Sequence, residues 1–201
     1  MVDYLLVSKP RITIDVFRSV LKSAQSPAYT EATACWKAIV AAGIDPALAL
    51  AQFDKESTYG KFGAAHLNHS WGNLRGYPGG QFKHYPTWAA GAADYARLLA
   101  SSLYAGSAHY NTARTMPYRY APSADHNSPA AYGQFLVNMI QHYRTLNATP
   151  SPAPVYYTVV SGDTLSGIAI KFHTTVAHLL YLNPTIKDPN LIHPGDKVRV
   201  R

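Results

Sequence analysis

The C-terminal segment opens with Tyr157-Thr158-Val159-Val160-Ser161-Gly162-Asp163-Thr164-Leu165, which predicts a short alternating strand that ends in a Gly-Asp turn. Apolar residues then recur at the spacing of one buried helix face, at Leu165, Ile168, Ala169 and Phe172. A second short helix is expected at Val176–Leu182, and a final strand at Lys197–Val200. This order of strand, helix, helix and strand predicts a small α+β domain.

The whole of this segment, residues 156–201, resembles the LysM family. The resemblance implies a module that docks on glycans containing N-acetylglucosamine, mostly peptidoglycan and chitin. It also implies a glycan groove between two loops, with contacts from Gly162, Asp163, Thr164 and Leu165 on one side and from Asn190, Leu191 and Ile192 on the other. A structural interpretation stands beside this one, because Asp163 and Thr164 can also cap a helix, and Leu165 and Ile192 can also pack it.

The composition of the chain limits the classes of protein to which it can belong. Its 201 residues suit one domain of ordinary size plus a small one, and a hydrophobic content of 47% permits a sizeable core. The single cysteine, Cys35, excludes an intramolecular disulfide and a site built from several thiolates. The net charge of +7 suits an anionic wall polymer better than nucleic acid, because no Lys/Arg cluster forms a stripe.

Neither an export signal nor a membrane span is expected. The N-terminal apolar run Tyr4–Val7 is too brief for the core of a signal peptide. No stretch approaches the roughly 20 uncharged residues of a membrane-spanning helix. We therefore expect a soluble monomer, made in the cytoplasm, that needs no cofactor and binds neither a membrane nor nucleic acid.

A proline-rich stretch divides the chain. Asn147-Ala-Thr-Pro-Ser-Pro-Ala-Pro154 holds three prolines and no charge, which predicts a semi-rigid linker at 147–155 between a domain at 1–146 and the small one at 156–201. The first domain is predicted to be mainly helical, so the fold class is α+β. Helices are expected at 13–25, 31–42 and 46–56, and two more are expected after Thr87 and Ser128. Residues 60–80 are predicted to form loops, with one hairpin at most.

One glutamate stands where glycan chemistry needs an acid. Hydrolysis of a polysaccharide requires a carboxylic acid that keeps its proton near neutral pH beside the glycosidic oxygen. Glu56 follows the apolar helix that ends in Phe53, so the negative end of the helix dipole and an apolar neighbour should both raise its pKa. This is the direction that a general acid requires.

Four short motifs surround this candidate in order: Ala51-Gln-Phe-Asp-Lys-Glu56-Ser-Thr-Tyr-Gly60, Trp71-Gly72-Asn73-Leu74-Arg75-Gly76, Phe82-Lys-His-Tyr85-Pro-Thr-Trp88, and Tyr120-Ala-Pro-Ser-Ala-Asp125 followed by Pro129-Ala-Ala-Tyr132. They resemble the peptidoglycan glucosaminidases with a lysozyme-like fold, the family named after mannosyl-glycoprotein endo-β-N-acetylglucosaminidase. The resemblance covers about Thr13–Arg144. It implies a lysozyme-like catalytic domain with Glu56 as general acid and site residues Tyr59, Trp71, Asn73, Tyr120 and Tyr132.

Several of these residues have a second interpretation. Trp71 and Tyr59 suit core packing as well as stacking on sugar rings, and Tyr120 suits either the core or a cleft hydroxyl. Asn73 can shape a loop or orient groups in the cleft by hydrogen bonds. His66 and His69 show a His-x-x-His spacing without a third ligand, so we expect solvated loop histidines and no metal.

The second catalytic group is not evident from the sequence. The resembled enzymes are often assigned a second carboxylate on the loop or hairpin after the acid, yet no Asp or Glu lies between Lys61 and Lys83. Asp125 is the acidic residue within a cleft-like motif and is the candidate base, or a residue that orients one. Without it, the substrate's 2-acetamido oxygen can act as the nucleophile, or Glu56 alone can serve as acid and then base, as in lytic transglycosylases.

These observations lead to the hypothesis of a peptidoglycan hydrolase that cleaves the β-1,4 glycan strand as an endo-β-N-acetylglucosaminidase. The missing export signal suggests a phage endolysin released through a holin, or a virion-associated lysin. The alternatives are a lytic transglycosylase or muramidase of the same superfold, and a non-catalytic wall-binding structural protein.

Overall fold

The computed structural model describes residues 2–76, 80–123, 127–147 and 154–200. The chain divides into two compact units, Met1–Ala148 and Thr149–Arg201. Helices dominate the first unit, and a two-stranded sheet lies in the second, so the expected α+β class is confirmed. Most of the predicted linker lies outside the described residues. None of the described helices combines the length and the apolar character that a bilayer crossing demands.

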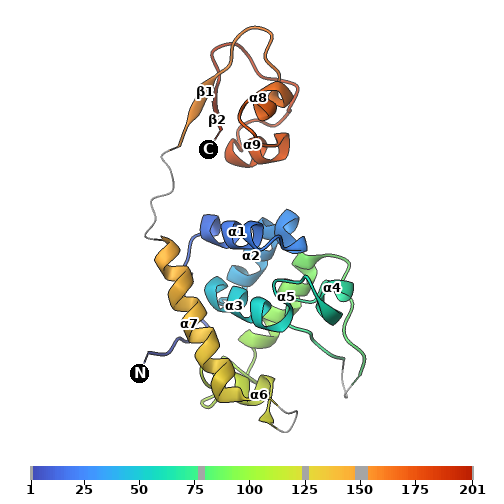
Figure 1. The fold of residues 1–201 in the computed structure, drawn as a ribbon, viewed down its shortest axis with the longest axis vertical. Coiled ribbons are helices and arrows are strands. Elements are labelled where there is room, and N and C mark those ends of the chain that lie inside the picture. The colour runs from blue at the N-terminus through green and yellow to red at the C-terminus, as the bar shows by residue number, and fades with distance from the viewer. Residues whose placement is uncertain (1, 77–79, 124–126, 148–153, 201) are drawn as a thin grey trace. The chain divides into compact units, whose positions relative to one another are not determined.

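The helices of the first unit surround one hydrophobic core (Figure 1). In chain order they are α1 (Ile14–Ser23), the 3₁₀ helix η1 (Pro27–Glu31), α2 (Ala32–Ala41), α3 (Pro46–Ser57), α4 (Gly63–Asn68), α5 (Trp88–Ala100), α6 (Pro117–Tyr120) and α7 (Pro129–Asn147). Five of them lie where the sequence predicts helices. The short elements η1, α4 and α6 were not predicted, because fewer than two turns show no apolar periodicity.

Helix α3 forms the centre of this unit. Every residue from Pro46 to Phe53 is buried, and α2 and α7 pack against the helix. Alanines at positions 47, 49 and 51 let these neighbours approach closely. The helix begins at the buried N-cap Asp45, whose carboxylate accepts hydrogen bonds from the backbone N–H of Ala47 at 3.2 Å and from the Arg11 guanidinium at 2.6 Å.

The N-terminal segment supports the start of α3, a pairing that the sequence did not indicate. The backbone N–H of Leu6 donates to the carbonyl of Asn111 at 2.9 Å, and the Leu6 carbonyl accepts from the N–H of Asp45 at 3.0 Å. Residues 5–7 thus form isolated bridges with two segments that are far apart in sequence. This pairing fixes the position at which α3 begins.

The end of α3 is equally constrained. Thr58, Tyr59 and Gly60 all have left-handed backbone conformations, with φ of 50°, 59° and 79°. The N–H of Gly60 donates to the Ser57 hydroxyl at 2.8 Å, which closes the turn. The chain therefore leaves the helix sharply after Ser57, which leaves Glu56 in the last helical turn.

The second unit has the predicted order of elements. Strand β1 (Tyr156–Thr158) pairs antiparallel with β2 (Lys197–Arg199), and α8 (Leu165–Lys171) and α9 (Val176–Leu182) lie between them in sequence. Asn183 joins α9 to the sheet, because its amide donates to the carbonyls of Leu179 and Arg199 and accepts from the N–H of Arg199. A small core forms between the helices and the strands.

We predict that Gly60→Ala destabilises the first unit. A Cβ at this position would lie 2.6 Å from the Phe53 and Trp88 rings. Strain at positive φ adds to the overpacking, for a total of about 2–4 kcal/mol. Urea unfolding followed by tryptophan fluorescence measures the loss, since Trp36, Trp71 and Trp88 all lie in this unit.

Gly63→Ala is the matched control for this prediction. Gly63 has a φ of 67°, but an added Cβ there would meet no atom within 4 Å. It should cost only the backbone strain, about 1 kcal/mol. Equal losses in the two variants would show that packing against Phe53 and Trp88 is not what requires glycine at position 60.

Candidate active site

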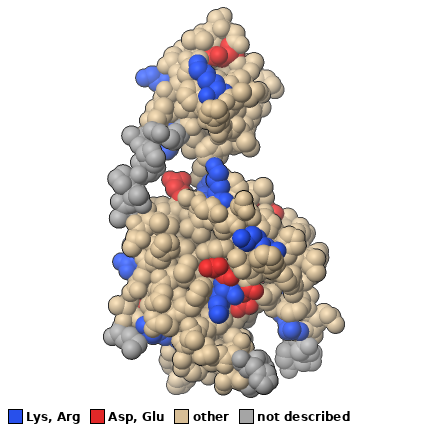
Figure 2. Space-filling view, viewed as in Figure 1, with Lys and Arg blue, Asp and Glu red and all other residues tan. Residues whose placement is uncertain are grey.

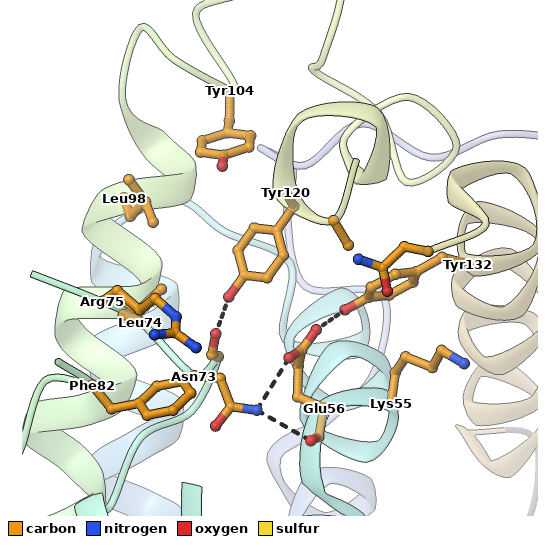
Figure 3. Close-up of a pocket in the computed structure, with 13 residues that line it drawn as sticks. Lys55, Glu56, Asn73, Leu74, Arg75, Phe82, Leu98, Tyr104, Tyr120 and Tyr132 are labelled. Atoms are coloured by element: carbon orange, nitrogen blue, oxygen red, sulfur yellow. Dashed lines mark hydrogen bonds between the residues drawn. The ribbon is translucent and has the colours of Figure 1, made fainter. Parts of the chain in front are cut away.

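A cleft of about 680 Å³ opens at the C-terminal end of α3. It draws on α3, the loop at 72–75, α5, α6 and α7, and Figure 3 shows these side chains converging from separate elements. The described residues that line it are Lys55, Glu56, Gly72, Asn73, Leu74, Arg75, Phe82, Leu98, Tyr104, Tyr120, Ala121, Asn127 and Tyr132.

Glu56 lies in the wall of this cleft and is held from two sides (Figure 3). The Tyr132 hydroxyl, from α7, donates to Oε1 of Glu56. The Asn73 side-chain amide donates to Oε2 at 3.2 Å and also to the Glu56 backbone carbonyl at 3.2 Å. The carboxyl is therefore fixed in orientation while it faces the cleft.

Burial raises the pKa of Glu56 above its ordinary value. The hydrogen bonds from Tyr132 and Asn73 and the nearby Lys55 ammonium act in the opposite direction, because they stabilise the carboxylate. Desolvation is the largest of these effects, so the pKa of the carboxyl is raised overall. This is the direction predicted from the sequence, and the physical cause is burial beneath the cleft wall.

The geometry of Asn73 supports the interpretation that this residue orients groups in the cleft by hydrogen bonds. Its backbone is left-handed, with φ of 52°, which turns the loop so that the side chain reaches Glu56. The Nδ2 group makes both bonds to Glu56, whereas the buried Oδ1 has no hydrogen-bond partner among the described residues. Because Oδ1 is buried, Asn73 acts on the site through the two bonds that its Nδ2 group makes to Glu56.

Tyr120 supports the same loop from the opposite side. Its hydroxyl donates to the carbonyl of Gly72. A side chain at Gly72 would collide with the Tyr120 hydroxyl and with the Tyr95 ring, at 2.3 Å and 2.8 Å. The structure thus brings together four of the predicted residues: Glu56, Asn73, Tyr120 and Tyr132.

Trp71 belongs to the core, which corrects its prediction as a substrate-binding residue. Its side chain is 0% exposed, and its ring stacks on Phe53 with centroids 4.0 Å apart. The indole N–H donates to the Ala49 carbonyl at 2.9 Å. The ring therefore has no free face for a sugar, and it supports the site only by supporting α3.

Two other candidates do not join the described cleft. The Tyr59 hydroxyl bonds to that of Tyr143 at 2.6 Å, and Tyr59 does not line the cleft. Asp125, the candidate base, lies outside the described residues. Within the described lining of the cleft, Glu56 is the single carboxylate.

The cleft also contains residues that sequence reasoning did not select. Arg75 and Phe82 form an isolated antiparallel bridge, and the Arg75 guanidinium lies over the Phe82 ring, 4.0 Å from its centroid. Both residues stood within the quoted motifs, but nothing local indicated that they meet. Lys55 lines the cleft beside Glu56, and its ammonium lies 5.7 Å from the centre of the Tyr132 ring.

The His-x-x-His pair makes separate backbone contacts. His66 Nδ1 bonds to the Gly60 carbonyl at 3.0 Å, and His69 Nδ1 bonds to the Tyr85 carbonyl at 2.9 Å. Over the described parts of the chain, no three His, Cys, Asp or Glu side chains gather as metal ligands do. These two rings serve local structure.

Charged side chains are dispersed over the surface. On the face that Figure 2 shows, Lys and Arg are scattered among uncharged residues and form no continuous stripe. At α5, Lys83 and Arg97 both pair with Asp94, with a Lys83–Asp94 distance of 2.9 Å. On this face the charge pattern therefore lacks the basic stripe that is typical of nucleic-acid binding.

In the second unit, the predicted groove residues divide between surface and core. Leu165 is only 2% exposed and belongs to the core, which corrects its prediction as a glycan contact, and Ile192 packs against the same core. Thr164 caps α8 by accepting from the N–H of Gly167 at 3.0 Å. Asp163 accepts from the Tyr157 hydroxyl and the Val160 N–H, and these bonds lower its pKa.

The three remaining predicted groove residues, Gly162, Asn190 and Leu191, are exposed. Leu191 is 63% exposed and lines a recess of about 490 Å³ between the loop at 185–191 and β2. Gly162 has a φ of 90° and open space where a Cβ would stand. These residues remain candidates for glycan contact.

Comparison with known proteins identifies the second unit. Residues 157–201 match the family model of the LysM domain, so this part of the chain is a LysM domain. The chain is 59% identical over 44 residues to the endolysin of Bacillus phage PZA and 39% identical over 56 residues to that of Bacillus phage B103. It is also 53% identical over 49 residues to a chlorophenol reductase of Desulfitobacterium hafniense.

These similarities are local. They cover 22%, 28% and 24% of this chain and 17%, 21% and 15% of the respective relatives. The endolysin matches lie in the LysM region. Similarity confined to so small a part of each protein does not specify chemistry, so the activity must be argued from the first unit.

We predict that Glu56→Gln changes how stability depends on pH. Because the folded-state pKa of Glu56 is raised, the stability that its proton provides is present at low pH and is lost as the pH rises through the folded pKa. Glutamine removes this dependence. Thermal unfolding should therefore show the variant gaining stability relative to the wild type as the pH rises.

Asp15→Asn removes an exposed carboxylate from the first turn of α1 and serves as the control. It removes one carboxylate outside the cleft, so a change seen in both variants reports the loss of a charge rather than the burial of Glu56. A constant difference between wild type and Glu56→Gln across the acidic and neutral range would contradict the raised pKa.

Proposed function

We propose that this protein is a cell-wall lytic enzyme of the endolysin type that cleaves the β-1,4 glycan strand of peptidoglycan. Glu56 acts as the general acid, and the LysM domain keeps the enzyme on the insoluble wall. The observation that carries the proposal is the carboxyl of Glu56, buried enough to raise its pKa and held in a cleft by Tyr132 and Asn73.

The chemistry follows from this arrangement. A glycosidic bond breaks when an acid protonates the leaving oxygen as the sugar gains positive charge. A carboxyl that keeps its proton near neutral pH supplies that step, and fixed orientation avoids the entropic cost of positioning it.

Cleavage on the reducing side of N-acetylglucosamine is the first candidate, by resemblance to the glucosaminidases. The 2-acetamido oxygen of that sugar can act as the internal nucleophile, which needs no second carboxylate. Asp125 remains the candidate base in the version that uses one.

A lytic transglycosylase is the second candidate. Like the route through the 2-acetamido oxygen, it agrees with Glu56 being the single carboxylate in the described lining of the cleft. One residue then donates a proton and later removes one from the 6-hydroxyl of the muramic sugar. Hydrolysis and transglycosylation leave different ends on the glycan, so analysis of the products distinguishes the two reactions.

The LysM domain supplies attachment to the wall. A tethered module raises the effective concentration of the cleft near its bonds without new contacts in the cleft itself. The endolysin names of two relatives support a phage origin for this combination. We propose release through a holin, or carriage in a virion, as the route to the wall.

Glu56→Gln is expected to lower lytic activity by at least about 100-fold, the contribution of a general acid. Turbidity loss of bacterial sacculi measures the rate, and Asp15→Asn is the charge-matched control. Equal clearing by wild type and Glu56→Gln would refute the role of Glu56. No clearing by either protein would favour the non-catalytic alternative.

Mass spectrometry of the digest assigns the bond. New reducing N-acetylglucosamine ends support the glucosaminidase, reducing muramic ends indicate a muramidase, and anhydromuramic ends indicate a lytic transglycosylase.

Activity should also fall as the pH rises through the folded-state pKa of Glu56, because the acid must hold its proton. The alkaline limb of the rate profile is expected above the ordinary glutamate value, owing to burial. Tyr132→Phe removes a hydrogen bond that lowers this pKa, so the limb should move to higher pH. Tyr118→Phe, at an exposed tyrosine, should not move it.

A further inference from the structure

The wall of the cleft opposite Glu56 contains a positively charged side chain, Arg75, which a neighbouring ring holds in place. Figure 3 shows Arg75 and Phe82 together on the side of the cleft across from Glu56. The Arg75 guanidinium lies 4.0 Å from the centre of the Phe82 ring. The ring contacts the flat face of the guanidinium, so the N–H groups at the edge of the guanidinium can still bind a ligand. Among the described residues, Arg75 has no acidic partner.

The other cations of this region are placed differently. A second recess of about 330 Å³ shares Leu74, Arg75 and Leu98 with the cleft and continues toward Lys83 and Arg97. Asp94 pairs with both Lys83 and Arg97, so it neutralises part of their charge. Arg75 is thus the cation at the junction of the two recesses that is available to a ligand.

The charge of the cleft indicates the kind of substrate. Its described lining holds Lys55 and Arg75 against the single carboxyl of Glu56, which is neutral when it holds its proton. A neutral glycan such as chitin gains nothing from this excess of positive charge. A glycan that bears carboxylates does, because guanidinium binds a carboxylate with two parallel hydrogen bonds.

We propose that Arg75, supported by Phe82, binds a carboxylate of the peptide stem on a muramic residue, and so selects peptide-bearing peptidoglycan over neutral glycans. This inference rests on the proposed function of the cleft and names the part of the substrate that the cleft recognises. The stem runs from the cleft into the recess that begins at Arg75.

The test compares two forms of one substrate. Soluble peptidoglycan strands are N-acetylated on their amines, and their carboxylates are then either left free or converted to primary amides. On the free-carboxylate strands, Arg75→Gln is expected to raise KM about 10-fold with little change in kcat, as expected for the loss of a charged hydrogen bond. On the amidated strands, wild type and variant should have the same KM.

Two variants separate charge recognition from a structural role. Arg75→Lys keeps the charge without the planar fork and should recover part of the lost affinity. Lys37→Gln removes an exposed positive charge from α2, away from the cleft, and should leave both substrates unaffected. An equal loss by Arg75→Gln on both substrates, or no loss on either, would overturn the proposal.

Direct binding keeps this test independent of catalysis. The side-chain Nε–H resonance of Arg75 is followed by NMR while a disaccharide tetrapeptide is added to the full chain. A shift with the free carboxylates that is absent with their amides supports the inference even if the chain cleaves nothing, in which case only the proposed function fails. A response to a wall phosphate polymer but not to the muropeptide would assign the site to phosphate and refute the stem.

Discussion

The course of α3 through the first unit is the constraint on which the rest of the site depends. The helix is buried from Pro46 to Phe53, and it emerges at the cleft only in its last turn. Gly60 lets the chain turn away because no side chain fits between the Phe53 and Trp88 rings. A helix fixed at both ends can hold a carboxyl in one place, and this fixes Glu56 in the cleft wall.

The chemistry of Glu56 follows from a competition between burial and hydrogen bonding. Two donors and a nearby ammonium favour the charged carboxylate, whereas removal from water favours the neutral acid, and burial is the larger effect. Tyr132 and Asn73 therefore orient the group, and its pKa remains above the ordinary value. Keeping this carboxyl away from water lowers the stability of the fold, a cost that is common at functional sites.

The two units divide the task of recognition. In the function that we propose, the LysM domain attaches the chain to a glycan without deciding what reaction follows. The cleft would then supply the chemistry through Glu56, and we propose that its cationic wall at Arg75 favours the charged part of the polymer. In this proposal, attachment to the wall and selection of the substrate depend on separate surfaces.

Local chemistry determined much of this protein from sequence alone. Helix caps at Thr13, Asp45 and Thr87, the apolar periodicity of the longer helices and the LysM segment all depend on neighbours a few residues away. The position of Glu56 near a helix end was likewise evident from the local sequence. Only the tertiary structure decided that Trp71 is core rather than a sugar platform, that the N-terminal segment holds the start of α3, and that Arg75 and Phe82 meet across from Glu56. The reason is physical: burial and facing walls arise when separate elements pack together in space, and the local pattern of residues does not encode that packing.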